Sequence, residues 1–236
     1  MRPLPLLLAV LLLALAFVCV RMGLWQHGRW QERRAANATQ AAALAASPVP
    51  LSRGAELATR VGRKVEAVGE YDSTRHVLLS RESARGEMGV QVLTPLRLAG
   101  GGEVLVDRGW IAADSAAAVH PSAFTMRGEQ RVVALAQALP PHASNLPWVR
   151  LDSAAPERWS TMDVGGDSLS ARLAGVDTRV MLHALPDAAS APLSRGMPAP
   201  FDERANLSYA VQWALFTLAA LAGAAFVLTR RPRTGS

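Results

Sequence analysis

Two apolar runs, one near each end of the chain, constrain its fold more than any other feature. The first extends over Leu4–Val20 and continues through Leu24 and Trp25, and the second covers Tyr209–Leu228. Each reaches the about 20 residues that a helix needs to cross a membrane. We therefore predict two membrane spans, which place both chain ends on one side of the bilayer and the long middle part on the other.

A cleaved signal peptide is the alternative interpretation of the first run, because Arg2 supplies a charged start. The small-residue pattern of a cleavage site is interrupted by Phe17, Val18 and Cys19. We therefore expect the first run to remain as a span.

Arginines beside the second span set the expected orientation. Arg230, Arg231 and Arg233 outweigh Arg204 across this span, which favours a cytoplasmic tail. The arginines after the first span, beginning with Arg21, favour the opposite orientation, but a long loop is translocated largely regardless of its charge. We expect a bacterial inner (plasma) membrane protein with cytoplasmic termini and a periplasmic middle, or the mitochondrial counterpart of that arrangement.

Between the two runs the pattern changes from helical to β-like. Residues that favour helices follow the first run and end before Pro48. Glycines 100–102 predict a hairpin, and the segment DSLSARLAG predicts a short helix capped by Asp167 or Ser168. The expected strands are KVEAVGEY, HVLLS, GVQVLTPLRL, EVLVDRGWI, QRVVALAQAL, WVRLD and TRVMLHAL.

The predicted fold is thus a two-span transmembrane α-hairpin enclosing a β-rich extramembrane domain, an antiparallel sheet or small barrel with a short helix. The expected segments are the first span (1–25), a helical extension and linker (26–47), the periplasmic β-rich domain (48–185), a second linker (186–205), the second span (206–229) and a basic tail (230–236).

Composition argues against several classes of protein. The formal net charge of +6 comes almost entirely from arginine, and no basic run is interleaved with aromatic residues, so we expect no nucleic-acid partner. Cys19 is the sole cysteine, which excludes an intramolecular disulfide and a cysteine-based metal site. The five histidines lack metal-ligand spacing, and no nucleotide-binding, hydrolase or zinc-peptidase motif is present. We predict neither a metal site nor an enzyme.

Aromatic and polar residues gather at the predicted outer boundary of both spans. Tryptophan and tyrosine favour that depth, and arginines there can pair with lipid headgroups, so a plain membrane interface is one interpretation. The other is that the two helices meet and enclose a flat amphiphile, whose carboxylates reach Arg29, Arg33 or Arg204. The gathered residues are Trp25, Gln26, Arg29, Trp30, Asn206, Tyr209, Gln212 and Trp213.

Several motifs, in order along the chain, carry a resemblance to a known family. GLWQHGR, VLVDRGWI and SYAVQWALF resemble the Gly-x-Trp-Gln-x-x-Arg, Val-x-Arg-Gly-Trp and Tyr-Ala-x-x-Trp signatures of the surfeit locus protein 1 family of cytochrome c oxidase assembly proteins. The second signature usually has Asn where this chain has Asp107. Further family-motif residues, expected to be structural or to contact a partner, are Gly69, Tyr71, Gly89, Thr94, Pro95, Arg108, Gly109 and Trp110.

The resemblance implies a membrane-anchored, non-enzymatic assembly factor that assists haem a insertion into the large subunit of a haem-copper terminal oxidase. Its expected partners are that subunit, the enzymes of haem a synthesis and the lipid bilayer. The implied haem site comprises Trp25, Gln26, Arg29, Asn206, Tyr209 and Trp213. A scaffold that binds no haem is one alternative, and an enzyme of haem or quinone chemistry is another.

One departure from the family pattern affects the implied haem site. Many members have a histidine three residues before the Tyr of Tyr-Ala-x-x-Trp, and this chain has Asn206 there. An amide does not replace imidazole as a strong iron ligand. His27 is the only histidine near either span and is the alternative ligand.

Overall fold

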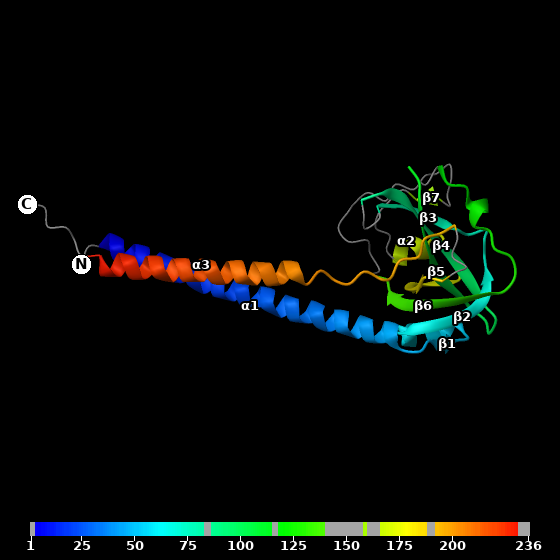
Figure 1. The fold of residues 1–236 in the computed structure, drawn as a ribbon, viewed down its shortest axis with the longest axis horizontal. Helices are drawn as coiled ribbons and strands as arrows, with labels where there is room; N and C mark the ends of the chain where they lie inside the picture. The colour runs from blue at the N-terminus through cyan, green and yellow to red at the C-terminus, as the bar shows by residue number, and fades with distance from the viewer. Residues whose placement is uncertain are drawn as a thin grey trace, which may run out of the picture. The chain divides into compact units, whose positions relative to one another are not determined.

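The computed structural model describes residues 3–82, 86–114, 118–139, 158–159, 166–187 and 192–230. The chain forms two compact units, one made of Met1–Thr39 with Pro200–Ser236 and the other of Gln40–Ala199. The first unit contains a pair of long helices and the second a β-barrel (Figure 1).

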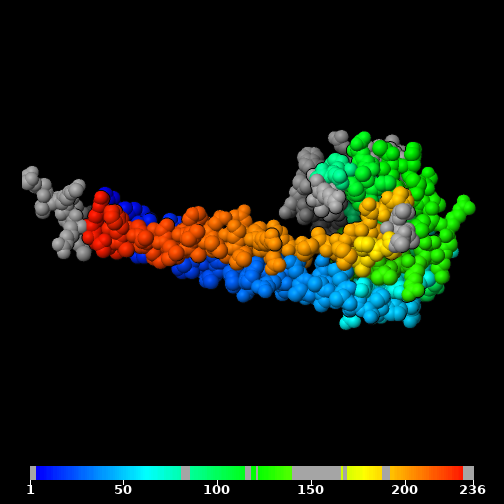
Figure 2. All heavy atoms as spheres, viewed as in Figure 1, coloured from blue at the N-terminus to red at the C-terminus, as the bar shows by residue number. Residues whose placement is uncertain are grey.

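The helices α1 (Pro3–Ala45) and α3 (Arg204–Thr229) are both long and apolar enough to cross a membrane. This confirms the two predicted spans. Helix α1 continues without a break from the apolar run through the predicted extension and ends three residues before Pro48. Figure 2 shows the side chains of α1 and α3 in contact along the length of α3.

The two helices pack along a seam in which buried and half-buried residues recur at alternating intervals of three and four. This heptad spacing is typical of antiparallel helices packed as in a coiled coil. Small side chains dominate the apolar part of the seam, where they allow the backbones to approach closely. The seam series are Ala9, Leu12, Ala16, Cys19, Gly23, Gln26, Trp30, Arg33 and Asn37 on α1, and Asn206, Ala210, Trp213, Thr217, Ala220, Ala224 and Val227 on α3.

Contacts along the seam fix its antiparallel register. A Cβ on Gly223 would lie 3.4 Å from Leu12 Cδ1, and one on Gly23 would lie 3.4 Å from Trp213 Cβ. Further along, Asn37 donates its amide to the Phe201 carbonyl at 2.9 Å and accepts the Phe201 N–H at 2.8 Å.

In the second unit, five strands close into a barrel in the order β2–β6–β8–β5–β4, because β4 also pairs with β2. The strands of the sheet are β1 (Val49–Leu51), β2 (Lys64–Tyr71), β3 (Val77–Glu82), β4 (Met88–Leu98), β5 (Glu103–Ala112), β6 (Gln130–Ala138), β7 (Arg158–Trp159) and β8 (Val176–Ala184). The barrel is completed by α2 (Gly166–Ser170) and the 3₁₀ turns η1 (Gly54–Arg60) and η3 (Pro121–Phe124).

Buried side chains at alternate positions along the strands fill the interior of the barrel. In β2 every second residue from Val65 to Tyr71 is buried, so one face of the strand lines the core. The main core joins this face to inward residues of β4, β5, β6 and β8, including Leu96, Val106 and Leu182. Barrel closure removes the two open edges that these strands would otherwise present to solvent.

Most of the predicted segments are found as strands, and the hairpin at glycines 100–102 joins β4 to β5. The sheet is not wholly antiparallel, since β5 pairs parallel with β8. The predicted short helix is shorter than expected: α2 begins at Gly166 and ends at Ser170, so positions 167 and 168 lie inside its first turn rather than at its cap. The predicted strand WVRLD, at 148–152, lies outside the described residues.

Candidate functional site

An open groove runs between α1 and α3, beside their seam. Its volume is about 530 Å³, within the range of about 300 to 1,000 Å³ that small-molecule sites occupy. The lining is mainly apolar, with small residues in its middle, and it carries no charged side chain. It is formed by Cys19, Val20, Gly23, Leu24 and His27 of α1 and by Leu207, Ala210, Val211, Ala214, Thr217 and Leu218 of α3.

His27 is the sole imidazole among the groove-lining residues. Its Nε2 lies 3.1 Å from the side-chain nitrogen of Gln31, one helical turn further along α1. The imidazole ring lies 5.2 Å from the Trp30 ring, measured between centroids. In the described part of the chain, no three His, Cys, Asp or Glu side chains come together to hold a metal ion, so a metal bound in the groove would rely on few protein ligands.

Asn206 lies in the seam and is 9% exposed. Its side-chain nitrogen donates to Gln26 Oε1 at 2.7 Å, which links the two helices where the apolar part of the seam ends. The Oδ1 atom of Asn206 is buried without a hydrogen-bond partner. The residue is not among those that line the groove.

The other aromatic boundary residues do not line the groove. Trp213 is half-buried in the seam, with its ring edge-to-face to Phe216 at 5.8 Å. Tyr209 and Trp25 are 51% and 55% exposed and do not line the groove. The structure therefore places Gln26, Asn206 and Trp213 in the seam and His27 in the groove.

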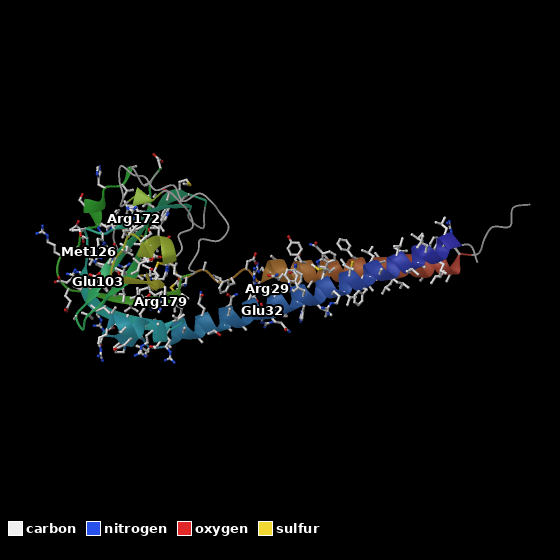
Figure 3. The ribbon with its side chains drawn as sticks, turned by 180° about the vertical axis from the view of Figure 1, so that it is seen from behind. Arg29, Glu32, Glu103, Met126, Arg172 and Arg179 are labelled. Carbon is white, nitrogen blue, oxygen red and sulfur yellow. The ribbon has the colours of Figure 1, made fainter. Side chains whose placement is uncertain are left out.

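The three arginines near this boundary differ in their interaction partners. Arg29 forms an ion pair with Glu32 at 2.5 Å, and Figure 3 labels both residues on α1. Arg33 donates to the main-chain carbonyl of Asp202 at 2.5 Å. Arg204 is exposed at the start of α3.

Comparison with known families decides the identity of the chain. The family model described as the SURF1 family matches residues 13–218, from within α1 through the barrel and into α3. This chain belongs to the SURF1 family. Members of the SURF1 family are generally cytochrome oxidase assembly factors. The comparison with curated proteins gave no match.

The SURF1 motif glycines of the barrel occur where another backbone or ring comes close. A Cβ on Gly69 would lie 2.1 Å from the Arg97 carbonyl oxygen, at the β2–β4 contact that closes the barrel. A Cβ on Gly89 would lie 2.1 Å from Cζ2 of Trp110, so the indole covers this glycine from the neighbouring strand. Gly89 and Trp110 thus fit together, whereas Gly69 allows the close approach of the β4 backbone.

Arg108 and Tyr71 form a buried pair inside this SURF1 barrel. The Arg108 guanidinium lies 4.5 Å from the centre of the Tyr71 ring, and its Nη1 donates to the Phe124 carbonyl at 2.6 Å. Burial lowers the pKa of Arg108 and raises that of Tyr71. A cation over an aromatic face is stabilised by the ring quadrupole, more strongly when both groups are shielded from water.

His76 adjoins the same cluster. Its Nδ1 lies 2.8 Å from Thr94 Oγ1, and the ring is 2% exposed. Burial, together with the positive charge of Arg108, lowers the pKa of His76 to about 4. The imidazole is therefore neutral at physiological pH.

A strap of residues after β8 returns to β5 next to the Arg108-Gly109-Trp110 motif. The main chains of Trp110 and Ser194 exchange two hydrogen bonds of 2.9 and 2.7 Å. Gly109 has a φ of +120°, and a Cβ there would lie 2.7 Å from the Ser194 carbonyl oxygen. Glycine is thus needed at position 109 so that the strap can pack against β5.

Asp107 links β5 to the neighbouring strands β4 and β8. It is 1% exposed and accepts from Gln91 Nε2 at 2.6 Å, while His183 Nδ1 lies 2.8 Å away. The other ring nitrogen of His183 lies 3.1 Å from the Gly196 carbonyl. Asp107 thus links β5 to β4 through Gln91 and to β8 through His183.

Sequence reasoning placed a possible ligand between the two spans but identified His27 alone among the residues that line the groove, and it missed the Asp107–His183 pair. Gly23, Ala210 and Ala214 make the groove possible, and small residues at helical spacing were a signal that could have located it. His183 is 76 residues from Asp107, and only strand pairing brings the two together.

Proposed function

We propose that this SURF1 family protein assists the insertion of haem a into the large catalytic subunit of a haem-copper terminal oxidase. The observation that carries the proposal is the open groove beside the helix seam, which combines an apolar lining with one imidazole. A porphyrin has the matching chemistry, a flat apolar body with a metal centre and charged carboxylates.

The groove residues fit such a group in two respects. Gly23, Ala210 and Ala214 leave the space that a planar ring needs, and His27 offers a nitrogen donor of the kind that holds haem iron. His27 would hold the haem at this site, and the haem would supply an iron centre able to take a nitrogen donor.

The haem carboxylates require a cation at the outer end of the groove. Arg204 is exposed at the start of α3 and can supply it without breaking an ion pair found in the described residues. Arg29 would first have to leave Glu32, and Arg33 would have to leave the Asp202 carbonyl. We therefore favour Arg204 as the first cation that a carboxylate meets.

The arginine balance across α3 supports a location in the inner membrane, with the barrel in the periplasm and both termini cytoplasmic. In that orientation the open groove adjoins the outer leaflet.

The proposal is tested in cells that make haem a and lack this protein. The quantity measured is the haem a content of the purified oxidase large subunit, with and without the restored chain. We expect the content to fall in its absence and to recover on restoration, at an unchanged amount of the large subunit. An unchanged haem a content would contradict the proposal.

A scaffold that holds the immature oxidase subunit without touching haem is the second candidate. The placement of Asn206 favours it, because the residue is engaged with Gln26 in the seam and does not face the groove. The two functions differ in one measurement: the scaffold would stabilise the amount of the large subunit, whereas the haem carrier would change its haem content.

A further inference from the structure

We infer that His27 provides the protein ligand to haem iron in this chain. The inference rests on the proposed function and assigns a residue to the same groove. It is carried by which lining residues can donate to iron, by the exposure of His27 at the groove and by the hydrogen bond that engages Asn206 in the seam.

Only two groove-lining residues have side chains of the kinds that usually hold haem iron, the imidazole of His27 and the thiol of Cys19. Cys19 is 2% exposed and packed in the seam. It stands eight residues before His27, which is about 12 Å along a helix at about 1.5 Å per residue. His27 is exposed at the groove wall, so its ring can turn toward a ligand without opening the seam.

His27 makes a hydrogen-bond contact with a neutral neighbour on the same helix. Its Nε2 lies 3.1 Å from the side-chain nitrogen of Gln31, and both residues are exposed. An unprotonated ring nitrogen is the form that coordinates metals. The bond lies at an exposed position, so iron can displace Gln31 at little cost.

Asn206 is excluded as the ligand by its placement as well as its chemistry. Its amide nitrogen is committed to Gln26 across the seam at 2.7 Å, and the residue does not line the groove. His27 follows Gln26 directly on α1. The Gln26–Asn206 bond therefore holds the turn of α1 that presents His27, which makes these two residues positioning residues.

The test uses the full chain purified in mild detergent and titrated with ferric haem b as a stable probe. The readouts are the Soret spectrum and the electron paramagnetic resonance signal of the iron, which reports a nitrogen ligand. We expect His27→Ala to weaken haem binding by more than about ten-fold and to lose the nitrogen signature. Added imidazole should restore that signature, which shows that the groove itself is intact.

Two matched variants complete the design. Gln31→Ala removes the neighbour but not the ligand and should bind haem as the native chain does. His120→Ala removes an exposed histidine of the barrel and should leave binding and spectrum unchanged.

The outcomes separate the two proposals. A native chain that binds haem with an unchanged nitrogen signature in His27→Ala would overturn the ligand assignment and leave the carrier function standing. A native chain that binds no haem would overturn both, and the oxidase haem content would then decide for or against the scaffold.

Discussion

Asn206 and Gln26, 180 residues apart in the sequence, join α3 to α1 through a hydrogen bond of 2.7 Å. The bond lies where the seam changes from small apolar side chains to polar ones. A single polar pair in an apolar helix interface fixes register, because any shift would leave two amides unpaired. Asn206 thus has a structural task in this chain, at the end of the apolar part of the seam.

The first prediction concerns this pair. Gln26→Leu should leave the Asn206 amide buried without a partner and loosen the seam by about 0.6 to 1.7 kcal/mol. Cys19, the sole cysteine, is 2% exposed in the seam, so its rate of reaction with a small membrane-permeable thiol reagent measures seam opening. The rate should rise about 3- to 18-fold, the equivalent of that free energy.

The double variant Gln26→Leu/Asn206→Leu is the matched control, since it removes both polar groups together. Its labelling rate should return toward that of the native chain, because two apolar residues of suitable size pack without an unpaired amide. Equal rates in the single and double variants would show that the amide pair contributes nothing to the seam.

The second prediction concerns the groove and rests on the proposed function. Ala214→Phe should fill the groove from α3 and weaken the binding of ferric haem b by more than about ten-fold. Leu215→Phe, at the adjacent position that is 59% exposed and does not line the groove, should have no effect. Unchanged binding in Ala214→Phe would place the haem elsewhere.

The spans and most strands could be predicted because each is determined by local sequence pattern. A run of about 20 apolar residues or a short alternating run carries its own signal. The parallel pairing of β5 with β8 has no local sequence signal, because it depends on how the chain crosses over through β6. The short extent of α2 was also unpredictable, since five helical residues have almost no periodicity to detect.

The candidate site was only partly predictable. The sequence located Gln26, His27, Asn206 and Trp213 near one boundary, which the structure supports by bringing Gln26 and Asn206 into contact. Helical spacing did not distinguish the seam from the groove beside it, because the angular position of the partner helix is a tertiary property. Trp213 and His27 therefore could not be assigned to seam and groove in advance.

The third prediction concerns the strap beside the Arg108-Gly109-Trp110 motif. Gly109→Ala should lower the free energy of unfolding of the barrel by about 3 kcal/mol, because φ is +120° and the new Cβ would meet the Ser194 carbonyl at 2.7 Å. Gly128 also has a positive φ, of +74°, but a Cβ there would have no atom within 4 Å. Gly128→Ala should therefore lower the free energy of unfolding by only about 1 kcal/mol. Urea unfolding of the detergent-solubilised chain, followed by far-ultraviolet circular dichroism, compares the two. Equal losses would mean that the strap contact at Ser194 adds no constraint.

The fourth prediction concerns pH and follows from the buried His76. Its pKa is about 4 in the folded protein, because of burial and the Arg108 charge, and about 6.5 in an unfolded chain. Above pH 6.5 both states are neutral at this site and the barrel has its full stability. As pH falls from 6.5 toward 4, the unfolded chain takes up a proton that the folded barrel resists, so the free energy of unfolding falls by up to about 3 kcal/mol.

The variant His76→Gln isolates this effect, because glutamine can still hydrogen-bond Thr94 but does not titrate. Burial alone would raise the pKa of Asp72, but hydrogen bonds from Thr74 and Arg75 outweigh this effect and lower it. Asp72 therefore loses its stabilising contribution only as the pH falls below 3.8, the ordinary pKa of the carboxyl group. It therefore contributes little in the window from pH 6.5 to 4. Urea unfolding at several pH values in that window should show a decline for the native chain that is smaller for the variant. The same decline in both would mean that another group, and not His76, takes up the proton on unfolding.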